Sequence, residues 1–392
     1  MNQPIRDVVI VDAVRTPFGK RNGGLSGAHT AELLGTVQRS VLERTEVPGD
    51  QVDQVIAGCV NQVGMQSVNL GRTAWLTAGL PVTVPARTVE AACGSSQEAA
   101  NLGYALIASG AADVVLSCGA EVMSRVPMGS TIPKDGSLGK PITQAYRAQR
   151  EYTTQFEGAE RIASKWGIGR ADCDAFGKLS QDRAAAAHRD GRFDSQLLPV
   201  RVPLPERPDE VHVVERDECL RETTLEGLAG LKPVGRPDAV HTAGTSSQIS
   251  DGASAVLMMT REKAAEFGLT PMARIVDTCL IGTDPVLMMT GPIPATSKLL
   301  DDNGLQMRDI SVVEINEAFA SVVLAWEREL RPDMAGVNPN GGAIAMGHPL
   351  GATGTGLITK AIHELHRSDG EFALITMCCG GGMATGTLIQ RI

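Results

Sequence analysis

The sequence predicts an α/β fold made of two similar halves, and the pattern of apolar runs is the first reason. Short apolar runs at residues 55–57, 114–116 and 312–313 have Gly or Asp close by and alternate with helix-forming stretches. Strands that are apolar throughout and separated by helices are typical of a sheet covered on both faces. An internal repeat and a proline-rich interruption between its two copies are the other reasons.

The internal repeat consists of two pairs of similar segments. Residues 113–119 resemble residues 372–380, and residues 9–12 resemble residues 274–277. Each half has the order strand, helix, strand, small-residue turn, helix, strand. The turn carries Cys93 in the first half and His348 in the second. Duplication with a pseudo-twofold axis would bring these two turns face to face.

The repeat breaks between residues 121 and 249. This stretch holds Pro127, Pro133, Pro141 and a proline-rich run at 199–208, with helical runs expected at 159–166 and 172–189. We therefore expect an insertion that lies over the site. The expected division is an N-terminal half of residues 1–120 plus about 250–271, a loop domain of residues 121–249, and a C-terminal half of residues 272–392.

The composition fits a globular protein of two or three domains and argues against nucleic acid and membranes as partners. Of the 392 residues, 43% are hydrophobic and 21% are charged, and the net charge is −9. Nucleic acid and anionic membrane surfaces need a basic footprint, so we expect neither as a partner. No uncharged apolar run approaches the ~18 residues that span a bilayer, and no signal peptide is recognisable. We expect a cytoplasmic protein.

The cysteines argue against a metal site. Eight of them are scattered along the chain without a C-x-x-C pair, at positions 59, 93, 118, 173, 219, 279, 378 and 379. This spacing is typical of reduced cytosolic thiols rather than a disulfide framework or a zinc site. No Walker loop or dinucleotide fingerprint follows a strand. We therefore expect no metal and no permanently bound cofactor.

Cys93 is the first candidate for chemistry. It lies where an apolar stretch meets a small-residue turn, and the turn opens a helix-forming run at 97–108. The unpaired N–H groups and positive dipole end of a helix favour the thiolate, which is the nucleophilic form of cysteine. A buried cysteine that only packs is the alternative.

Two downstream glycine-rich segments offer partners for this thiol. His348 lies in the segment 341–351, and an imidazole can take a thiol proton or donate to an oxyanion near neutral pH. Cys378 and Cys379 lie in the segment 377–382. A thiol could exchange a proton with a carbon acid, but adjacent strand residues point to opposite faces, so these residues alone do not choose between the two cysteines.

Four motifs in order resemble the thiolase family, whose enzymes make or break the carbon–carbon bond of a 3-ketoacyl-CoA. They are the Cys93 turn, Asn-Glu-Ala-Phe at 316–319, the stretch 338–354, and Cys-Cys-Gly-Gly-Gly at 378–382. The resemblance runs from residue 11 to the end of the chain. It implies duplicated mixed-sheet halves in five αβαβα layers with an inserted loop domain. Residues 241–248 and 313–326 look most like actinobacterial thiolases that degrade sterol side chains.

The resemblance also implies catalytic roles. Cys93 would carry the acyl group and His348 would act as base and oxyanion donor. The family pattern Cys-x-Gly-Gly-Gly selects Cys378 for proton exchange. Asn316 would fix a water that stabilises an enolate oxygen, with helix capping as the alternative. A second oxyanion hole would consist of the backbone N–H groups of Cys93 and Gly380.

Coenzyme A is expected as a substrate. By resemblance, Ser247 would bond its pantetheine part, and Arg221 would lie near the adenine nucleotide unless it is only a solvated surface residue. CoA thioesters are therefore the expected partners. Two departures from the family pattern stand out: Ser96 replaces a Gly after the nucleophile, and residues 155–160 replace the Met-Gly-x-Thr-Ala-Glu run of short-chain biosynthetic members.

The departure at residues 155–160 favours a degradative acyltransferase with a wider pocket. We expect thiolytic cleavage of a 3-ketoacyl-CoA to acetyl-CoA and a shortened acyl-CoA, in fatty-acid or sterol side-chain β-oxidation. The alternatives are an acetoacetyl-CoA-forming acetyl-CoA acetyltransferase, a ketoacyl synthase, a Cys-His acyl-thioester hydrolase, and an inactive CoA-binding scaffold. The acyl chain is not predictable from the sequence.

A homo-oligomer is expected, a homotetramer built as a dimer of dimers in which nucleophile-bearing strands pair. Residues 69–81 match a family segment at the subunit contact. On a helix they place Leu70, Ala74 and Trp75 together, an apolar face that a monomer would leave partly wet.

Overall fold

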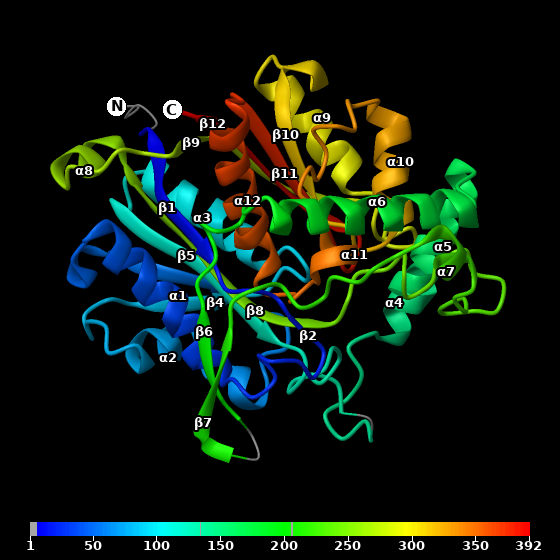
Figure 1. Cartoon of the computed structure of the whole chain (residues 1–392), viewed down its shortest axis with the longest axis horizontal. Helices are drawn as coiled ribbons and strands as arrows, with labels where there is room; N and C mark the ends of the chain where they lie inside the picture. Colours follow the sequence, from blue (N-terminus) through cyan, green and yellow to red (C-terminus); the bar gives the residue numbers. More distant parts are fainter. Residues whose placement is uncertain (1–5, 134, 205–206) are drawn as a thin grey trace.

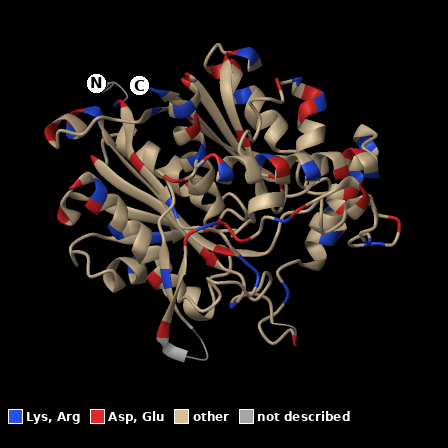
Figure 2. Ribbon diagram, in the orientation of Figure 1, with Lys and Arg blue, Asp and Glu red and all other residues tan. Residues whose placement is uncertain are grey.

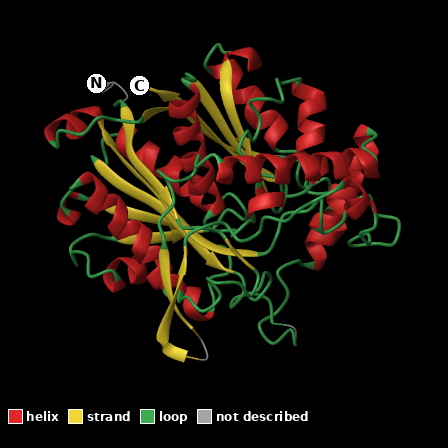
Figure 3. Ribbon diagram, viewed as in Figure 1, coloured by secondary structure: helices red, strands yellow, loops and turns green. Residues whose placement is uncertain are grey.

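One mixed sheet runs through the whole molecule (Figures 1 and 3). The computed structural model describes residues 6–133, 135–204 and 207–392. The sheet has ten strands in the order β10-β11-β12-β9-β1-β8-β5-β3-β4, with β2 added beside β8. The strands are β1 (Val8–Arg15), β2 (Gly19–Lys20), β3 (Gln54–Gly58), β4 (Ala86–Val89), β5 (Val114–Val122), β8 (Ser250–Thr260), β9 (Ala273–Gly282), β10 (Ile310–Ile315), β11 (Phe372–Cys379) and β12 (Met383–Arg391).

The two ends of this sheet repeat one another. On one side β3 is parallel to β5, and β5, β8 and β1 follow in antiparallel order. On the other side β10 is parallel to β11, and β11, β12 and β9 follow in antiparallel order. The halves meet where Val9 and Ile10 of β1 pair with Arg274 and Ala273 of β9. The segment pairs that resemble each other in sequence are thus the equivalent strands β5 with β11, and β1 with β9.

The helices complete five layers. Between the two parts of the sheet lie α3 (Ser95–Ala108) and α12 (Thr353–Ser368), which contact each other and strands of both halves. Outside the first half lie α1 (Thr30–Thr45) and α2 (Leu70–Thr77). Outside the second lie α9 (Pro292–Asp302) and α10 (Ala320–Leu330). In Figure 2 the ribbon colours of charged residues lie mostly on the outer helices and loops, and the inner strands are mostly tan.

The first turns of the two central helices touch. The Thr355 N–H donates to the Ser96 Oγ at 3.0 Å, and a Cβ on Gly354 would lie only 2.1 Å from the Gln97 nitrogen. Cys93 stands just before α3, and His348 stands five residues before α12. The duplication therefore does bring the two predicted turns together. The division into residues 1–120 with 250–271, 121–249 and 272–392 stays a prediction, supported by the pairing of β8 with β1 and β5.

The prediction that a monomer would leave the apolar face of α2 partly exposed to water is wrong. Leu70, Ala74 and Trp75 are all fully buried within the single chain. They belong to the core that α1 and α2 form on the outer face of the sheet, and the Trp75 indole N–H donates to the Pro81 carbonyl at 2.8 Å. The helical spacing marks the apolar face correctly, but α1 and the sheet cover it, so it gives no argument for a subunit contact.

The insertion forms helices near the site and a separate hairpin. Its helices are α4 (Gln144–Gln149), α5 (Gln155–Trp166), α6 (Arg170–Arg189) and α7 (Leu225–Ala229), so the runs expected at 159–166 and 172–189 lie inside α5 and α6. α5 packs on α10, and α6 packs on the short α11 (Ala343–Met346). These contacts hold them near the Asn316 and His348 segments.

The proline-rich run at 199–208 does not lie over the site. It contributes β6 (Val200–Leu204) and the start of β7 (Arg207–Val214), a hairpin that points away from the C-terminal half in Figure 1. Val200, Val202 and Val214 join the core beneath α1. Residues 205–206 of the expected run lie outside the described residues. The remaining helix, α8 (Arg261–Glu266), follows β8.

Candidate active site

A cavity of about 230 Å³ brings the two halves and the insertion together. Cys93 comes from the first half, His348 from the second, and Phe156 from α5 of the insertion. Ser247 also lines it, and most of the remaining wall is apolar, with Met123, Met128, Val234, Ile249, Ala318, Phe319 and Leu350. A mostly apolar cavity with a few convergent polar groups is the usual form of a small-molecule binding or catalytic site.

The turn at Cys93 is sharp. Ala92 has a φ of 49°, a left-handed conformation that costs a residue with a Cβ about 1 kcal/mol or more. Gly94 is the N-cap of α3, and a Cβ there would lie 2.6 Å from the Cys379 Sγ, so no larger residue fits. The Ala91 N–H donates to the Ser95 hydroxyl at 3.0 Å and closes the turn. The backbone thereby presents Cys93 to the cavity at the helix N-terminus.

The thiolate form that the helix N-terminus was expected to favour is not favoured at Cys93. Burial raises the pKa of Cys93 to about 12, and the neighbouring Cys379, Glu121 and Glu90 act in the same direction. Desolvation of the charged form thus exceeds the effect of the helix N-terminus. At neutral pH Cys93 is a thiol, so its nucleophilic form requires a base in the cavity.

His348 is held as a neutral base. Its Nδ1 lies 2.6 Å from the Thr353 Oγ1, whose own hydroxyl donates to the Pro349 carbonyl at 2.9 Å. Because that hydroxyl proton is engaged, Nδ1 must carry the imidazole proton and Nε2 is left with a lone pair. Burial lowers the pKa of His348 to about 4, so the ring is neutral at pH 7. Sequence reasoning missed Thr353, although its place five residues after the histidine was a usable signal.

Asn316 lies beside this base. Its Nδ2 is 3.4 Å from the His348 Nε2, and its backbone N–H donates to Thr376 of β11 at 3.0 Å. The capping alternative is wrong, since α10 begins at Ala320 with Phe319 as N-cap. The Asn316 Oδ1 is buried and has no hydrogen-bond partner among the described residues. A buried amide oxygen left in this way is available to a water or a substrate group.

The two adjacent cysteines flank the Cys93 turn. Cys378 is buried in the C-terminal core, and Cys379 has its sulfur against Gly94. Burial, and then the neighbouring Cys93, raises the pKa of Cys378 well above its usual value. Burial also raises the pKa of Cys379, to about 11. Gly380 packs beside Ala92, which brings its backbone next to the nucleophile.

Ser247 and Arg221 lie along neighbouring cavities. The Ser247 N–H donates to the Ala318 carbonyl at 3.0 Å, which ties this loop to the Asn-Glu-Ala-Phe motif. Arg221 lines a second pocket of about 260 Å³. Its guanidinium donates to the Ala243 carbonyl at 3.4 Å. Ala243 lines the cavity of Ser247, and its neighbour Gly244 lines the pocket of Arg221, so the two spaces follow one another along the loop.

Two buried carboxylates that sequence reasoning missed hold the loops around the site. Glu121, at the end of β5, accepts N–H groups from Asn61 and Gly351, both at 3.0 Å. Glu317 accepts the Ser180 hydroxyl at 2.6 Å and the Ile344 N–H at 3.1 Å. Burial raises the pKa of Glu317. The Asn-Glu pair at 316–317 was a signal for Glu317, whereas nothing in the sequence marks Glu121.

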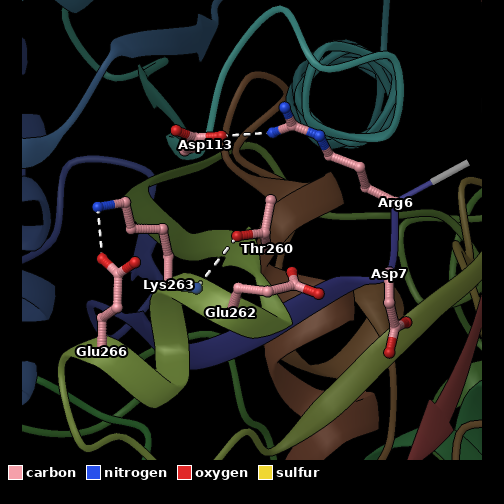
Figure 4. A pocket seen from close by; sticks show the side chains of 7 residues that line it. All are labelled: Arg6, Asp7, Asp113, Thr260, Glu262, Lys263 and Glu266. Carbon is pink, nitrogen blue, oxygen red and sulfur yellow. Dashed lines mark hydrogen bonds and ion pairs between the residues drawn. The ribbon is translucent and has the colours of Figure 1, made fainter. Parts of the chain in front are cut away.

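A separate surface pocket of about 580 Å³ is unrelated to this chemistry (Figure 4). It lies at the starts of β1 and β5, whereas Met123, which lines the catalytic cavity, follows the other end of β5. Arg6 pairs with Asp113 there, and Lys263 with Glu266 at 2.6 Å. Within the described residues, no group of His, Cys, Asp or Glu is arranged to hold a metal, and no helix is long and apolar enough to cross a membrane.

Comparison with known families identifies the fold. The thiolase N-terminal domain matches residues 8–262, and the thiolase C-terminal domain matches residues 269–391. The chain belongs to the thiolase family. It is therefore an acyltransferase with the thiolase fold, as the four motifs predict.

Relatives of this thiolase align over nearly all of its length. A steroid 3-ketoacyl-CoA thiolase of Mycobacterium tuberculosis is 44% identical over 98% of this chain and 94% of its own. A β-ketoadipyl-CoA thiolase of Acinetobacter baylyi is 41% identical over 99% and 100%. The acetyl-CoA acetyltransferase structure of Bacillus anthracis has a TM-score of 0.92 at 34% identity and covers both chains fully. Human mitochondrial 3-ketoacyl-CoA thiolase has a TM-score of 0.90 at 36% identity, with 99% of both chains covered.

Proposed function

We propose that this thiolase cleaves a 3-ketoacyl-CoA with coenzyme A, giving acetyl-CoA and an acyl-CoA two carbons shorter. The observation that carries the proposal is the pair Cys93 and His348, which face one cavity as neutral thiol and neutral imidazole with Nε2 unprotonated. The relatives named as 3-ketoacyl-CoA and β-ketoadipyl-CoA thiolases support the degradative direction.

In the first half-reaction Cys93 attacks the substrate. The His348 Nε2 takes the Cys93 proton, and the thiolate adds to C3 of the 3-ketoacyl-CoA. The C2–C3 bond then breaks, its electron pair passes to C2, and the enolate of acetyl-CoA leaves. Cys378 supplies the proton that C2 requires, and Asn316 with a bound water stabilises the enolate oxygen. The acyl group remains on Cys93 as a thioester.

In the second half-reaction coenzyme A takes the acyl group. The proton that His348 took from Cys93 first passes to the Cys378 thiolate, which restores the neutral imidazole. His348 then removes the CoA thiol proton, and the CoA sulfur adds to the acyl carbonyl. The C–S bond to Cys93 breaks, and the Cys93 thiolate takes the proton back from His348. The backbone N–H groups of Cys93 and Gly380 hold the carbonyl oxygen as it gains charge. Ser247 holds the pantetheine and Arg221 the nucleotide end of CoA. CoA is a substrate in this scheme, and no metal takes part.

One panel of assays can establish the direction of the reaction and the acyl group of the preferred substrate. We propose a cytoplasmic enzyme of fatty-acid or sterol side-chain β-oxidation, and its eight free cysteines suit that compartment. Acetoacetyl-CoA formation from two acetyl-CoA is the second candidate, favoured by the likeness to the Bacillus anthracis acetyltransferase. Comparing kcat/KM for short, long and steroid-linked 3-ketoacyl-CoA thiolysis with that for condensation separates the two. Hydrolysis without added CoA would overturn both.

We propose that the enzyme is a homotetramer built from dimers. β4, which precedes the Cys93 turn, is an edge strand of the sheet, and among the described residues no strand pairs with its outer side. An open edge strand is a ready site for pairing with a second copy. Val82 lies four residues before β4 and is 74% exposed; Val68 is 85% exposed, and its neighbour Asn69 donates its side-chain N–H to the Ala86 carbonyl of β4 at 2.9 Å. Light scattering at micromolar concentration that showed a stable, active monomer would contradict this proposal.

A further inference from the structure

Four buried polar side chains link the helix that follows the nucleophile to the β11–β12 hairpin that carries Cys378. They lie on α3 and β12, are at most 6% exposed, and are Gln97, Asn101, Thr385 and Thr387. α3 belongs to the first half of the fold and the hairpin to the second. The two sulfurs of the proposed reaction therefore come from different halves, and contacts between the halves set the position of one against the other.

Gln97 makes the central contact of this link. It lies in the first turn of α3, four residues after Cys93. Its Nε2 donates to the Ile375 carbonyl of β11 and to the Thr387 hydroxyl of β12, both at 2.9 Å. The Thr385 hydroxyl donates to its Oε1 at 2.6 Å. One carboxamide thus ties α3 to both strands of the hairpin.

The two threonines give this carboxamide a single orientation. The Thr387 hydroxyl donates its proton to the Asn101 Oδ1 at 2.8 Å, so it accepts from Gln97 and does not donate to it. The Thr385 proton is held by the Gln97 Oε1. A side chain of the same length without an amide would leave these buried groups without their partner, which is costly in a site that water does not reach.

The contact lies directly beside the turn that presents the nucleophile. A Cβ on Gly94 would lie 2.7 Å from the Thr385 Cγ2 and 2.6 Å from the Cys379 Sγ, so the turn and the hairpin touch here. Across the β11–β12 ladder Thr385 pairs with the residue just before Cys378. The hydrogen bond between Gln97 and Thr385 therefore sets how closely the hairpin approaches the turn, and with it where Cys378 stands.

We propose that Gln97 is a positioning residue for the proton transfer by Cys378. This inference rests on the proposed thiolysis, in which C2 of the substrate receives its proton from Cys378 alone. The oxyanion site for the acyl group depends less on the hairpin, because the Cys93 N–H supplies one of its two donors from the turn itself. Without Gln97, proton exchange should therefore slow far more than acylation of Cys93.

The test measures two partial reactions on the same preparation of each protein. The first is single-turnover acylation of Cys93 by an acyl-CoA donor, followed by mass spectrometry. The second is exchange of hydrogen for deuterium at the methyl group of acetyl-CoA in deuterated water, followed by NMR. A loss of folded protein lowers both rates by the same factor, so the ratio of exchange to acylation reports the position of Cys378 rather than stability.

Three variants act on the link itself. Gln97→Met keeps the length of the side chain and removes its three hydrogen bonds. It should lower the ratio about tenfold or more, since a misplacement of about 1 Å can cost about 100-fold in rate. Thr385→Val removes the hydroxyl that holds the carboxamide and should also lower the ratio. Thr385→Ser retains that hydroxyl and should restore the ratio.

Asn101→Leu is the matched control. Asn101 lies one turn further along α3, and its Nδ2 donates to the Gly386 carbonyl at 3.4 Å and to the Cys279 carbonyl at 3.5 Å. The variant removes a buried amide from the same helix and the same network, but away from the nucleophile turn, and Thr387 can still accept from Gln97. Its melting temperature should fall while the ratio stays the same.

The results separate this inference from the proposed function. An unchanged ratio in Gln97→Met or in Thr385→Val, an equal fall in Asn101→Leu, or a ratio in Thr385→Ser as low as in the valine variant would each overturn the positioning role. If Gln97→Met does not fold, the two Thr385 variants decide. An unaltered protein that neither acylates Cys93 nor exchanges hydrogen would count against the proposed function instead.

Discussion

The hydroxyl of Thr353 decides which nitrogen of His348 can act as a base. Thr353→Val keeps the shape of the side chain but removes the oxygen that lies 2.6 Å from Nδ1. The ring is 4% exposed, so its Nδ1–H would be left buried without this acceptor. Such a loss costs about 1–3 kcal/mol, which corresponds to about a 5- to 150-fold change in an equilibrium.

The ring escapes that cost by moving its proton to Nε2, and in that form it cannot accept the Cys93 proton. We therefore expect Thr353→Val to lower kcat/KM for thiolysis by about 10- to 100-fold. Thr353→Ser retains the oxygen and should restore most of the activity. Thr359→Val is the matched control: Thr359 is buried on the same helix and donates its hydroxyl to the Thr355 carbonyl at 2.8 Å, away from the ring.

The assay pairs steady-state kcat/KM with single-turnover acylation of Cys93, followed by mass spectrometry. Thr353→Val should slow acylation itself, whereas Thr359→Val should reduce only the melting temperature. The reasoning is refuted if Thr353→Val acylates at the original rate, or if Thr353→Ser is as slow as the valine variant.

Three further outcomes are expected. Cys93→Ala should give no covalent acyl adduct with an acyl-CoA donor in mass spectrometry, and an adduct on Cys378 or Cys379 in the unaltered protein would reverse the assignment. Cys378→Ser should still acylate Cys93 but lose hydrogen exchange at the acetyl-CoA methyl group, while Cys379→Ser keeps most of its activity; the reverse result would exchange their roles. Burial lowers the pKa of His348 to about 4, so His348 stays an unprotonated base down to about pH 5. We therefore expect kcat/KM to stay constant as the pH falls from 7 to about 5 and to decrease as the pH approaches 4. A fall centred near pH 6.5, the ordinary histidine value, would contradict a buried neutral ring.

The fold was predictable because its signals are local and repeated. The likeness of residues 9–12 to 274–277 marks β1 and β9, which prove to be equivalent strands. The helix expected at 97–108 lies within α3. The tertiary partners of these elements were not readable in the same way. The apolar face of α2 looked like a subunit contact because nothing in residues 69–81 shows that α1 covers it.

The candidate residues were predictable, but their ionisation was not. Cys93 and His348 stand in recognisable motifs, and the structure places both in one cavity. Their charge depends on burial by segments far away in the sequence, so the helix N-terminus alone suggested the wrong state for Cys93. Thr353 and Glu121 escaped notice for a related reason: a threonine or a glutamate has no marked role until its hydrogen-bond partner is known.

The ionisation of this site has a consequence for how it works. Cys93, Cys378 and Cys379 all have raised pKa values and His348 a lowered one, so the resting cavity holds no charge on these four groups. A thiolate is the form that oxidants and alkylating agents attack, and its scarcity protects the partly exposed Cys93 and the buried Cys378 and Cys379 beside it. Charge has to arise during the reaction instead, first on the sulfur and imidazole and then on the substrate oxygen. The apolar walls that keep the thiol neutral also strengthen every donor aimed at that oxygen, because fewer water molecules screen it. The same burial therefore makes Cys93 unreactive at rest and makes its oxyanion donors effective once a substrate is bound.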